Sequence, residues 1–326
     1  MRTFRGLLSV CAACSAVIAT SVVASADRPE SYTCSGGNIP SGTYSSIRVT
    51  GYCFVPSGLV KVRGDVTLAR GAMLDATTPA GFGTPQAANL PGILQVGGNI
   101  EVGRGAVLFL GCDAAIVCPP GFSTYPGPPG LYPDFPVLGY SNPGDVVRGD
   151  IESRGALGVV VHSVKIGGDA SLIGGGGGPA QLTGGPGSGA CFNPTVVPVP
   201  PAWSASGVVT GSGFPLPVYS DFEENSIGGD LVVKGLQTCW MGALRNKIGG
   251  NLIDVNNTFG DPDANEVLTN LIRGDIVCHG NNSVVQIGDS AGPPNVVSGD
   301  ASGECAFNVI DPTGGPISVK APETES

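Results

Sequence analysis

The amino-acid sequence predicts an all-β fold, a parallel β-helix (solenoid) of about nine coils with three Gly/Pro-rich loop insertions. A five-residue motif recurs along the chain, asparagine recurs at a fixed distance before it, and 53 of the 326 residues are Gly while 28 are Pro. Repetition at coil-length spacing is the sequence signature of solenoids. No amphipathic helical pattern of useful length follows residue 26, so we expect few helices.

The recurring motif is Ile or Val, any residue, Gly, Asp or Asn, and then an apolar residue. Successive motif glycines are separated by 34, 51, 19, 61, 21, 24 and 25 residues, so the short spacings match one coil and the long ones match coils with inserted loops. Residues 49–53 look like a degenerate first copy. The eight good copies are Val62–Val66, Val96–Ile100, Val147–Ile151, Ile166–Ala170, Ile227–Leu231, Ile248–Leu252, Ile272–Ile276 and Val297–Ala301.

Alternation of side chains along a strand indicates which face of each coil is buried. In one copy Ile248, Gly250 and Leu252 share a face, which we expect to point inward. The Gly permits a bend, and the Asp or Asn beside it suits a corner, where a left-handed backbone conformation is an option. The eight motif glycines are therefore predicted to stack in one row, about 4.8 Å apart between consecutive coils.

A second repeated element lies four residues before the motif Gly in the last four coils. Because these asparagines fall on the inward parity, we expect them to stack as a buried ladder in which each amide bonds the next coil. The ladder residues are Asn225, Asn246, Asn270 and Asn295.

Three insertions, at about residues 75–91, 111–145 and 174–224, carry many of the aromatic side chains. These side chains either dock the loops against the solenoid wall, which we favour, or form a platform on which sugar rings stack. The residues concerned are Tyr125, Tyr132, Phe135, Tyr140, Trp203, Phe214, Tyr219 and Phe222.

Residues 1–26 are predicted to be a signal peptide. Arginines precede an uncharged, mostly apolar stretch that ends in the small-residue cleavage site Ala24-Ser25-Ala26. No later stretch is long and apolar enough to span a membrane, so no span is expected after cleavage. We expect the solenoid domain to occupy residues 27–310 and the polar residues 311–326 to form a disordered tail.

The cysteines agree with export. Two of the ten lie in the predicted signal peptide, and the remaining even number indicates four disulfides. None of the eight remaining cysteines forms a C-x-x-C pair and the chain has two histidines, so no structural zinc site is expected. Because a solenoid brings together residues near in sequence or one coil apart, the predicted pairs are Cys34–Cys53, Cys112–Cys118, Cys191–Cys239 and Cys278–Cys305.

The charge pattern excludes a basic nucleic-acid-binding protein. The chain has 16 Lys and Arg against 26 Asp and Glu, a formal charge of −10. Removing the signal peptide removes two arginines, which makes the mature charge −12. Such a surface is expected to repel anionic polymers unless a cation bridges them.

No catalytic, cofactor-binding or metal-binding residue emerges from the motifs. His279-Gly280 resembles one element of pectinolytic hydrolases, but their Arg-x-Lys element and clustered aspartates do not occur with it. The segment 261–265 opens like a calcium loop but has Glu at position six and Ile at position twelve. No cofactor is expected beyond weak Ca²⁺ binding by the motif aspartates Asp65, Asp150, Asp169, Asp230, Asp275 and Asp300.

The motif spacing and the asparagines resemble right-handed parallel β-helix proteins. The Asn-x-Ile-Gly-Gly-Asn/Asp coils with closing cysteines resemble uncharacterised secreted β-helix proteins of high-GC Gram-positive bacteria, over roughly residues 31–307. At the fold level the chain is similar to pectin-lyase-like β-helices and to bactofilin-type solenoids, although the latter lack signal peptides, disulfides and long loops.

The resemblance implies a right-handed parallel β-helix and leaves two functions open. The first is a secreted, extracellular, non-enzymatic protein with a structural role or a role in binding cell-surface proteins or cell-envelope polysaccharide. The alternative is a carbohydrate-active β-helix enzyme, a polysaccharide lyase or hydrolase. Clustered carboxylates in a cleft beside the loops would favour the enzyme, whereas a flat, repetitive surface would favour the binding protein.

Overall fold

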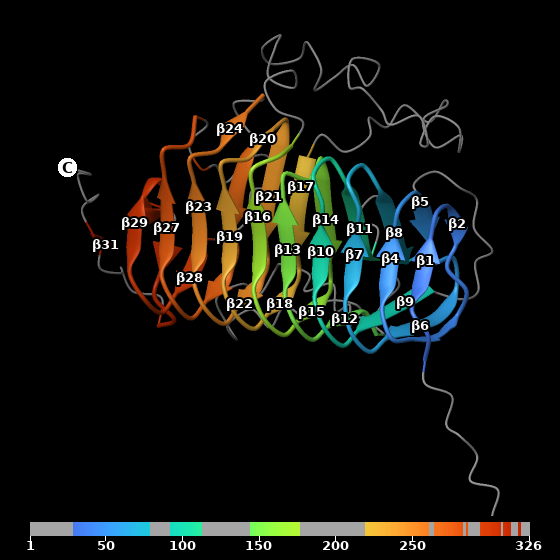
Figure 1. Cartoon of the computed structure of the whole chain (residues 1–326). Helices are drawn as coiled ribbons and strands as arrows, with labels where there is room; N and C mark the ends of the chain where they lie inside the picture. Colours follow the sequence, from blue (N-terminus) through green and yellow to red (C-terminus); the bar gives the residue numbers. More distant parts are fainter. Residues whose placement is uncertain are drawn as a thin grey trace, which may run out of the picture.

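The chain forms a right-handed parallel β-helix, seen in a computed structural model (Figure 1). The structure describes residues 29–78, 92–112, 144–176, 219–260, 264–282, 285, 294–307, 309–313 and 319–320. Among these residues no helix is long and apolar enough to cross a membrane. The predicted signal peptide and the predicted loop tips lie outside the described residues.

Three all-parallel sheets form the solenoid and a short pair lies beside them; among the described residues sheet B ends at β25, whereas sheets A and C continue to the last coils. Sheet A contains β1 (Tyr32–Cys34), β4 (Ile47–Val49), β7 (Val66–Leu68), β10 (Ile100–Val102), β13 (Ile151–Arg154), β16 (Ala170–Ile173), β19 (Leu231–Lys234), β23 (Leu252–Val255), β27 (Ile276–His279), β29 (Ala301–Gly303) and β31 (Val319–Lys320). Sheet B contains β2 (Gly37–Asn38), β5 (Tyr52–Phe54), β8 (Met73–Thr78), β11 (Val107–Cys112), β14 (Gly158–His162), β17 (Tyr219–Glu223), β21 (Trp240–Leu244) and β25 (Asn265–Leu268). Sheet C contains β3 (Gly42–Tyr44), β6 (Gly58–Val62), β9 (Gly92–Val96), β12 (Val146–Val147), β15 (Lys165–Ile166), β18 (Ser226–Ile227), β22 (Lys247–Ile248), β26 (Leu271–Ile272), β28 (Asn295–Val297) and β30 (Val309–Ile310). The pair is β20 (Gln237–Thr238) and β24 (Thr258–Phe259), and a 3₁₀ helix, η3, spans Glu304–Phe307.

The ends of the solenoid differ from the sequence prediction. Among the described residues sheet A has eleven strands, one for each coil, whereas about nine coils were predicted. Within the segment expected to be a disordered tail, Val319–Lys320 forms β31 and pairs with β29, which extends the solenoid beyond Ile310. At the other end, Gly51 is not a motif glycine. Its neighbour Tyr52 pairs with Met73 in sheet B, whereas Ser45 occupies the motif corner, because Gly64 donates its backbone N–H to the Ser45 carbonyl.

The eight motif glycines stack in one row at the corner between sheets C and A. Each backbone N–H donates to the carbonyl of the preceding motif Gly at 2.8–3.0 Å, through Gly98, Gly149, Gly168, Gly229, Gly250, Gly274 and Gly299, beginning at the Gly64 carbonyl. A Cβ built on Gly229 would overlap Oδ1 of Asp169 in the preceding coil. The motif therefore requires Gly because an acidic or amide side chain of the preceding coil occupies the space of its Cβ.

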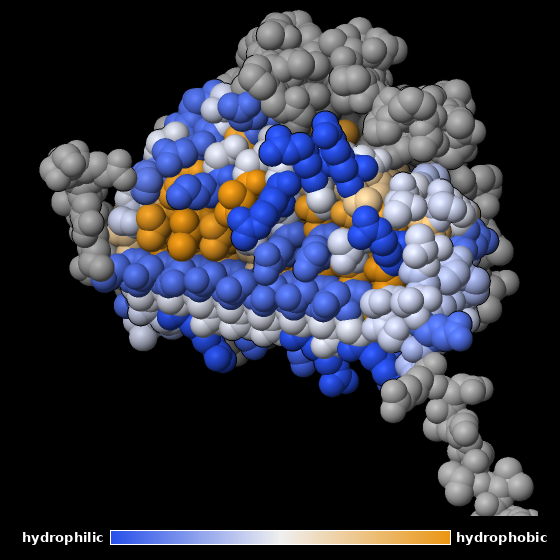
Figure 2. All heavy atoms as spheres, viewed as in Figure 1, coloured by the Kyte–Doolittle hydropathy of each residue, from blue (hydrophilic) through white to orange (hydrophobic). Residues whose placement is uncertain are grey.

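The Asp or Asn after each motif Gly forms a second, continuous row. Its Oδ1 accepts the backbone N–H of the equivalent residue in the next coil at 2.6–3.0 Å. None of these residues has a positive φ, so the left-handed conformation offered as an option at this corner is not used. We call this row the corner ladder: Asp65, Asn99, Asp150, Asp169, Asp230, Asn251, Asp275 and Asp300. Figure 2 shows a continuous hydrophilic row along this edge.

Replacing Gly229 with Ala is expected to lower the free energy of unfolding by about 1–3 kcal/mol, the usual cost of forcing a methyl group into packed space. The added Cβ must displace the Asp169 carboxylate from its bond to the Asp230 N–H. Chemical denaturation measures the effect. Gly42, which is exposed, has no positive φ and would bring an added Cβ no closer than 3.6 Å to any atom, gives the matched control. An unchanged midpoint for Gly229→Ala would contradict this account of the motif.

The interior is filled by the alternate apolar residues of the three sheets. In sheet A, Ile151, Ala170, Leu231, Leu252 and Ile276 stack in register and are buried. No coil closes a core of its own, so the apolar column is continuous along the axis. On the outer face of sheet A, half-buried Val232, Ile253 and Val277 form an apolar patch, visible in Figure 2.

Candidate functional site

The predicted asparagine ladder is present at the corner between sheets B and C. Asn246 donates from Nδ2 to Asn270 Oδ1 at 3.1 Å and to the Phe222 carbonyl at 2.6 Å, and its backbone N–H also reaches Asn270 Oδ1 at 2.9 Å. The same pattern recurs from Asn225 to Asn246 and from Asn270 to Asn295. All four asparagines are fully buried. The ladder therefore satisfies backbone and amide groups that would be costly to bury unpaired.

The residue before the ladder position has a left-handed backbone in four successive coils, which the sequence analysis did not predict; Asn295, in the next coil, follows Pro294 instead. Ser163, Glu224, Arg245 and Thr269 have φ of 55–60°, and Val164 takes the ladder position in the first of these coils. A shorter ladder at the corner between sheets A and B joins Leu236, Asn257, Asn281 and Glu304. Each of the three corners is therefore fixed by side chains that bond across coils.

Two of the predicted disulfides lie within the described residues. Cys34 of β1 bonds Cys53 of β5 with a Cα–Cα distance of 6.3 Å, which links sheets A and B across the first two coils. Cys278 of β27 bonds Cys305 of η3 with a Cα–Cα distance of 5.3 Å. Cys278 pairs in the sheet with Gly303, and the helix η3 that follows brings Cys305 back over it. Cys239 is also disulfide-bonded, whereas Cys118 and Cys191 lie outside the described residues.

Removing the C-terminal disulfide is expected to destabilise the protein. The double variant Cys278→Ser, Cys305→Ser should lower the free energy of unfolding by about 2–4 kcal/mol, because the unfolded chain gains conformational entropy when this disulfide no longer closes a loop. Denaturation of this variant tests the cost. Non-reducing peptide mapping tests the connectivity, and a Cys239–Cys278 peptide would contradict the C-terminal pair.

A cluster of ionisable side chains on the outer side of sheet B is the candidate site. Val160 of β14, Asp221 of β17, Gly242 of β21 and Glu266 of β25 stack in register along one row, and His162 of β14 pairs with Glu223 of β17. Asp221, Glu266 and His162 are 4%, 3% and 6% exposed. The sheet therefore places several acidic groups and one imidazole in a region with little water.

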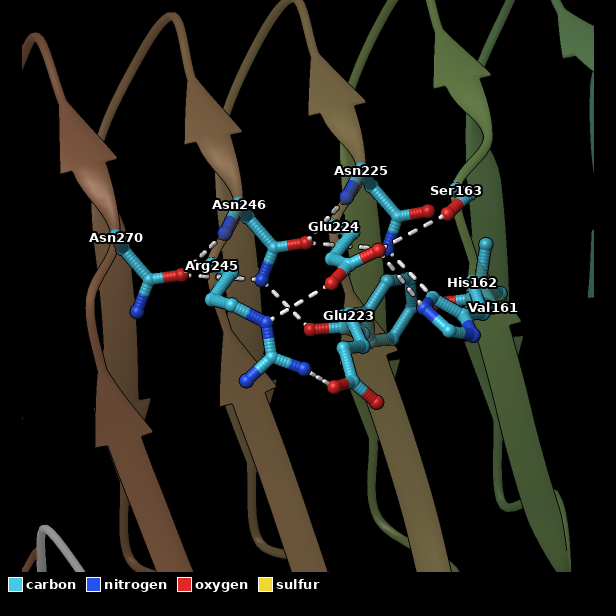
Figure 3. A network of polar contacts seen from close by, with 10 residues as sticks. Val161, His162, Ser163, Glu223, Glu224, Asn225, Arg245, Asn246 and Asn270 are labelled. Carbon is cyan, nitrogen blue, oxygen red and sulfur yellow. Dashed lines mark hydrogen bonds and ion pairs between the residues drawn. The ribbon is translucent and has the colours of Figure 1, made fainter. Parts of the chain in front are cut away.

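Arg245 and His162 hold one half of this cluster together (Figure 3). Arg245 forms ion pairs with Glu223 and with Glu224, to which its Nε donates at 3.0 Å. The other oxygen of Glu224 lies 3.2 Å from His162 Nε2 and 3.4 Å from the Ser163 hydroxyl. Glu224 and Arg245 reach this face because both occupy the left-handed turn before the ladder.

Asp221 forms the other half with Glu266. A Cβ on Gly242 would lie 2.8 Å from Asp221 Oδ1 and 2.5 Å from the Trp240 ring, so both side chains lean over this glycine. Asp221 Oδ1 has no hydrogen-bond partner among the described residues. Burial raises the pKa of Asp221 to about 8, against the lowering effect of Arg245, and the charges of Glu266 and Glu224 raise it further. We therefore expect Asp221 to hold a proton at neutral pH.

His162, Glu223 and Glu224 are the described residues that come close to a metal-binding geometry, with ligand atoms within 4.8 Å of one another. Arg245 already pairs with both glutamates, so its charge offsets one of their two negative charges, and both oxygens of Glu224 and one oxygen of Glu223 are engaged. The donor set therefore fits an ion-pair network better than a metal centre.

The sequence analysis missed this cluster because it assigned Asp221, Glu223 and Glu224 to the third insertion. The structure shows that the strand β17 begins at Tyr219, and likewise that Asp75–Thr78 belong to β8 rather than to the first insertion. The sequence signal that could have located this strand is Tyr-Ser-Asp-Phe-Glu at residues 219–223, in which Phe222 takes the inward position and is fully buried. Of the aromatics assigned to the insertions, Phe222 therefore packs in the core.

The other singled-out positions lie away from the cluster. The motif aspartates form the corner ladder, and His279 is exposed at the end of β27. The segment resembling a calcium loop is described from Ala264 onward, where Asn265 begins β25. Comparison of the chain with protein-family models, curated proteins and solved structures gave no match.

Proposed function

We propose that the protein is a secreted, non-enzymatic β-solenoid that binds extracellular or cell-envelope polysaccharide through its outer surface. The observation that carries this proposal is the cross-coil bonding at all three corners, which holds outward side chains in straight rows at one coil repeat. A linear polymer with a regular repeat matches such rows. The terminal disulfides and the resemblance to secreted β-helix proteins support an extracellular location.

A carbohydrate-active enzyme is the second candidate, and the grouping of Asp221, Glu266 and Trp240 favours it. A protonated acid beside a second carboxylate is the arrangement that glycoside hydrolysis uses. Both carboxylates are almost completely buried, however, whereas the rows on sheets A and C are open. We therefore place binding ahead of catalysis.

Affinity electrophoresis through gels containing purified cell-envelope polysaccharides, with and without Ca²⁺, tests the proposal. We expect retardation without the release of new reducing ends or unsaturated products. Products that disappear in Asp221→Asn would instead establish the enzyme. Unretarded migration in every polysaccharide would contradict the proposed function.

A further inference from the structure

The outer face of sheet A carries apolar and oppositely charged side chains in an arrangement that suits a second copy of the same face. We propose that two copies of the chain pair through this face, related by a two-fold axis parallel to the solenoid axis. The two solenoids then run side by side in the same direction, and each sheet A faces the other with its strands antiparallel. The pairing is independent of the proposed polysaccharide binding and leaves the outer face of sheet C open.

The outward side chains of sheet A form two rows, because side chains alternate between the two faces of each strand. In register, the first outward row contains Glu101, Glu152, Ser171, Val232, Ile253, Val277 and Ser302. The second outward row lies two residues further along each strand and contains Arg154, Ile173, Lys234, Val255 and His279. The two-fold rotation places the first outward row of each copy over the second outward row of the other, coil against coil.

The apolar patch lies in the C-terminal half of this face. Val232, Ile253 and Val277 of the first outward row are half-buried, and half-buried Ile173 extends the patch into the second row. Figure 2 shows the patch bordered by the hydrophilic corner ladder. Adjacent apolar side chains with a polar rim are typical of a protein contact surface. Because the rotation keeps each coil beside the same coil of the second copy, it brings patch against patch.

The charged half of the face separates acidic from basic residues. Glu101 and Glu152 are neighbours in the first outward row, where their like charges repel each other. The basic residues lie at the strand ends, where Arg104, Arg154 and Lys234 are exposed. Among the described residues these two glutamates form one loose ion pair, between Glu152 and Arg154 at 3.9 Å, with side chains 41% and 78% exposed. Within one copy the opposite charges are therefore poorly matched.

The two-fold rotation matches these charges between copies. Glu152 comes to lie opposite Arg154 of the second copy, and Glu101 comes to lie beside its Arg104, so the symmetry forms each contact twice. Turning the second copy end for end would keep the apolar contact but would lose these reciprocal Glu–Arg contacts.

The charged corner ladder and the strand ends set the rim of the contact. The ladder aspartates add little to the complementarity, because arginines lie two residues before three of them, at positions 63, 148 and 273. Lys234 and His279 lie opposite apolar residues of the second copy, and their long or amphipathic side chains can keep the polar groups in solvent.

The size of the face indicates a weak, reversible dimer. The seven strands from β10 to β29, at about 4.8 Å spacing, make a face roughly 30 Å long and 15 Å wide. Two copies would bury on the order of 1,000 Å² in total, which is the low end for specific interfaces. We therefore expect a dissociation constant in the micromolar range.

Sedimentation velocity of the disulfide-bonded protein, from about 1 to about 300 µM, tests the proposal. We expect the wild-type chain to shift from monomer to dimer over this range. Ile253→Glu buries a charge in the apolar contact and should weaken the dimer at least about tenfold. The matched control is Leu59→Glu, which places the same charge on the outer face of sheet C, where Leu59 is 43% exposed. The control should dimerise like wild type.

A charge swap tests the orientation of the two copies. Glu152→Arg sets two like charges opposite each other and should weaken the dimer about tenfold, whereas Glu152→Arg with Arg154→Glu should restore it, because the pair is only reversed. Should Ile253→Glu fail to fold, these exposed positions give the decisive variants.

A wild-type chain that stays monomeric at the highest concentration, or assembles beyond a dimer, would overturn the proposal. So would equal dimerisation of wild type and Ile253→Glu. Loss of the dimer in Glu152→Arg without restoration by the swap would overturn the parallel two-fold arrangement.

Discussion

Replacing Asn270 with Leu is expected to lower the free energy of unfolding by about 2–6 kcal/mol. The Asn270 side chain accepts two donors from Asn246, one of them the backbone N–H, and donates to the Ala243 carbonyl at 2.7 Å. Leu would leave the Asn246 N–H and the Ala243 carbonyl buried without partners, at about 1–3 kcal/mol each. Urea denaturation of the wild-type and variant proteins measures the difference.

Ser226→Leu is the control for this experiment. Ser226 also lies in a strand beside the ladder, but it is half-buried on the outer face of β18. We expect a change of less than about 0.5 kcal/mol for this surface site. If Asn270→Leu were as mild as the control, the ladder amides would contribute no more than solvated ones.

Raising the pH from 4 to 8 is expected to destabilise the protein by several kcal/mol. Burial raises the pKa of Asp221 to about 8 and those of Asp145 and Asp254 to about 7, from a usual value of 3.8. The folded state thus keeps protons that the unfolded state releases above pH 3.8. The resulting stability is fully present below pH 3.8 and is lost as the pH rises through 7–8. At 1.36 kcal/mol per pKa unit, Asp221 alone contributes up to about 6 kcal/mol.

Thermal unfolding at several pH values, compared with two Asp→Asn variants, identifies the groups responsible. Asp221→Asn removes the group that must lose its proton, so we expect a flatter pH profile and a higher melting temperature at pH 8. Asp65→Asn makes the same change at an exposed ladder position and should leave the slope unchanged. Parallel profiles for all three proteins would show that Asp221 does not hold a proton in the folded state.

The repeated parts of the fold were predictable because repetition in sequence becomes stacking in space. The glycine row and the asparagine ladder each depend on one residue type at a fixed position within the motif. That position can be recognised even where inserted loops change the length of a coil. The early coils show the limit of this reasoning. Gly51 matched the motif by residue type but not by spacing, because it lies 13 residues before Gly64, whereas Ser45, which occupies the motif corner at a coil spacing of 19 residues, has no distinguishing residue type.

The candidate site could not be predicted in the same way. His162 and Glu224 are 62 residues apart in sequence, and no repeated spacing joins them. Their contact depends on β17 resuming sheet B after an insertion whose end was placed at residue 224. Arg245 joins them one coil later through a left-handed turn. A contact between side chains that do not repeat along the chain can therefore be predicted only when the strand register is known.

The corner ladder uses a single oxygen from each of its first seven side chains, because Oδ1 accepts the next N–H whether the residue is Asp or Asn. The second group, a carboxylate oxygen or an amide nitrogen, takes no part in that bond. One edge of the solenoid can consequently carry anything from no charge to eight negative charges with the same backbone. Exchange of Asp and Asn along this edge would let related chains change the charge of the solenoid surface without changing the backbone of the coils.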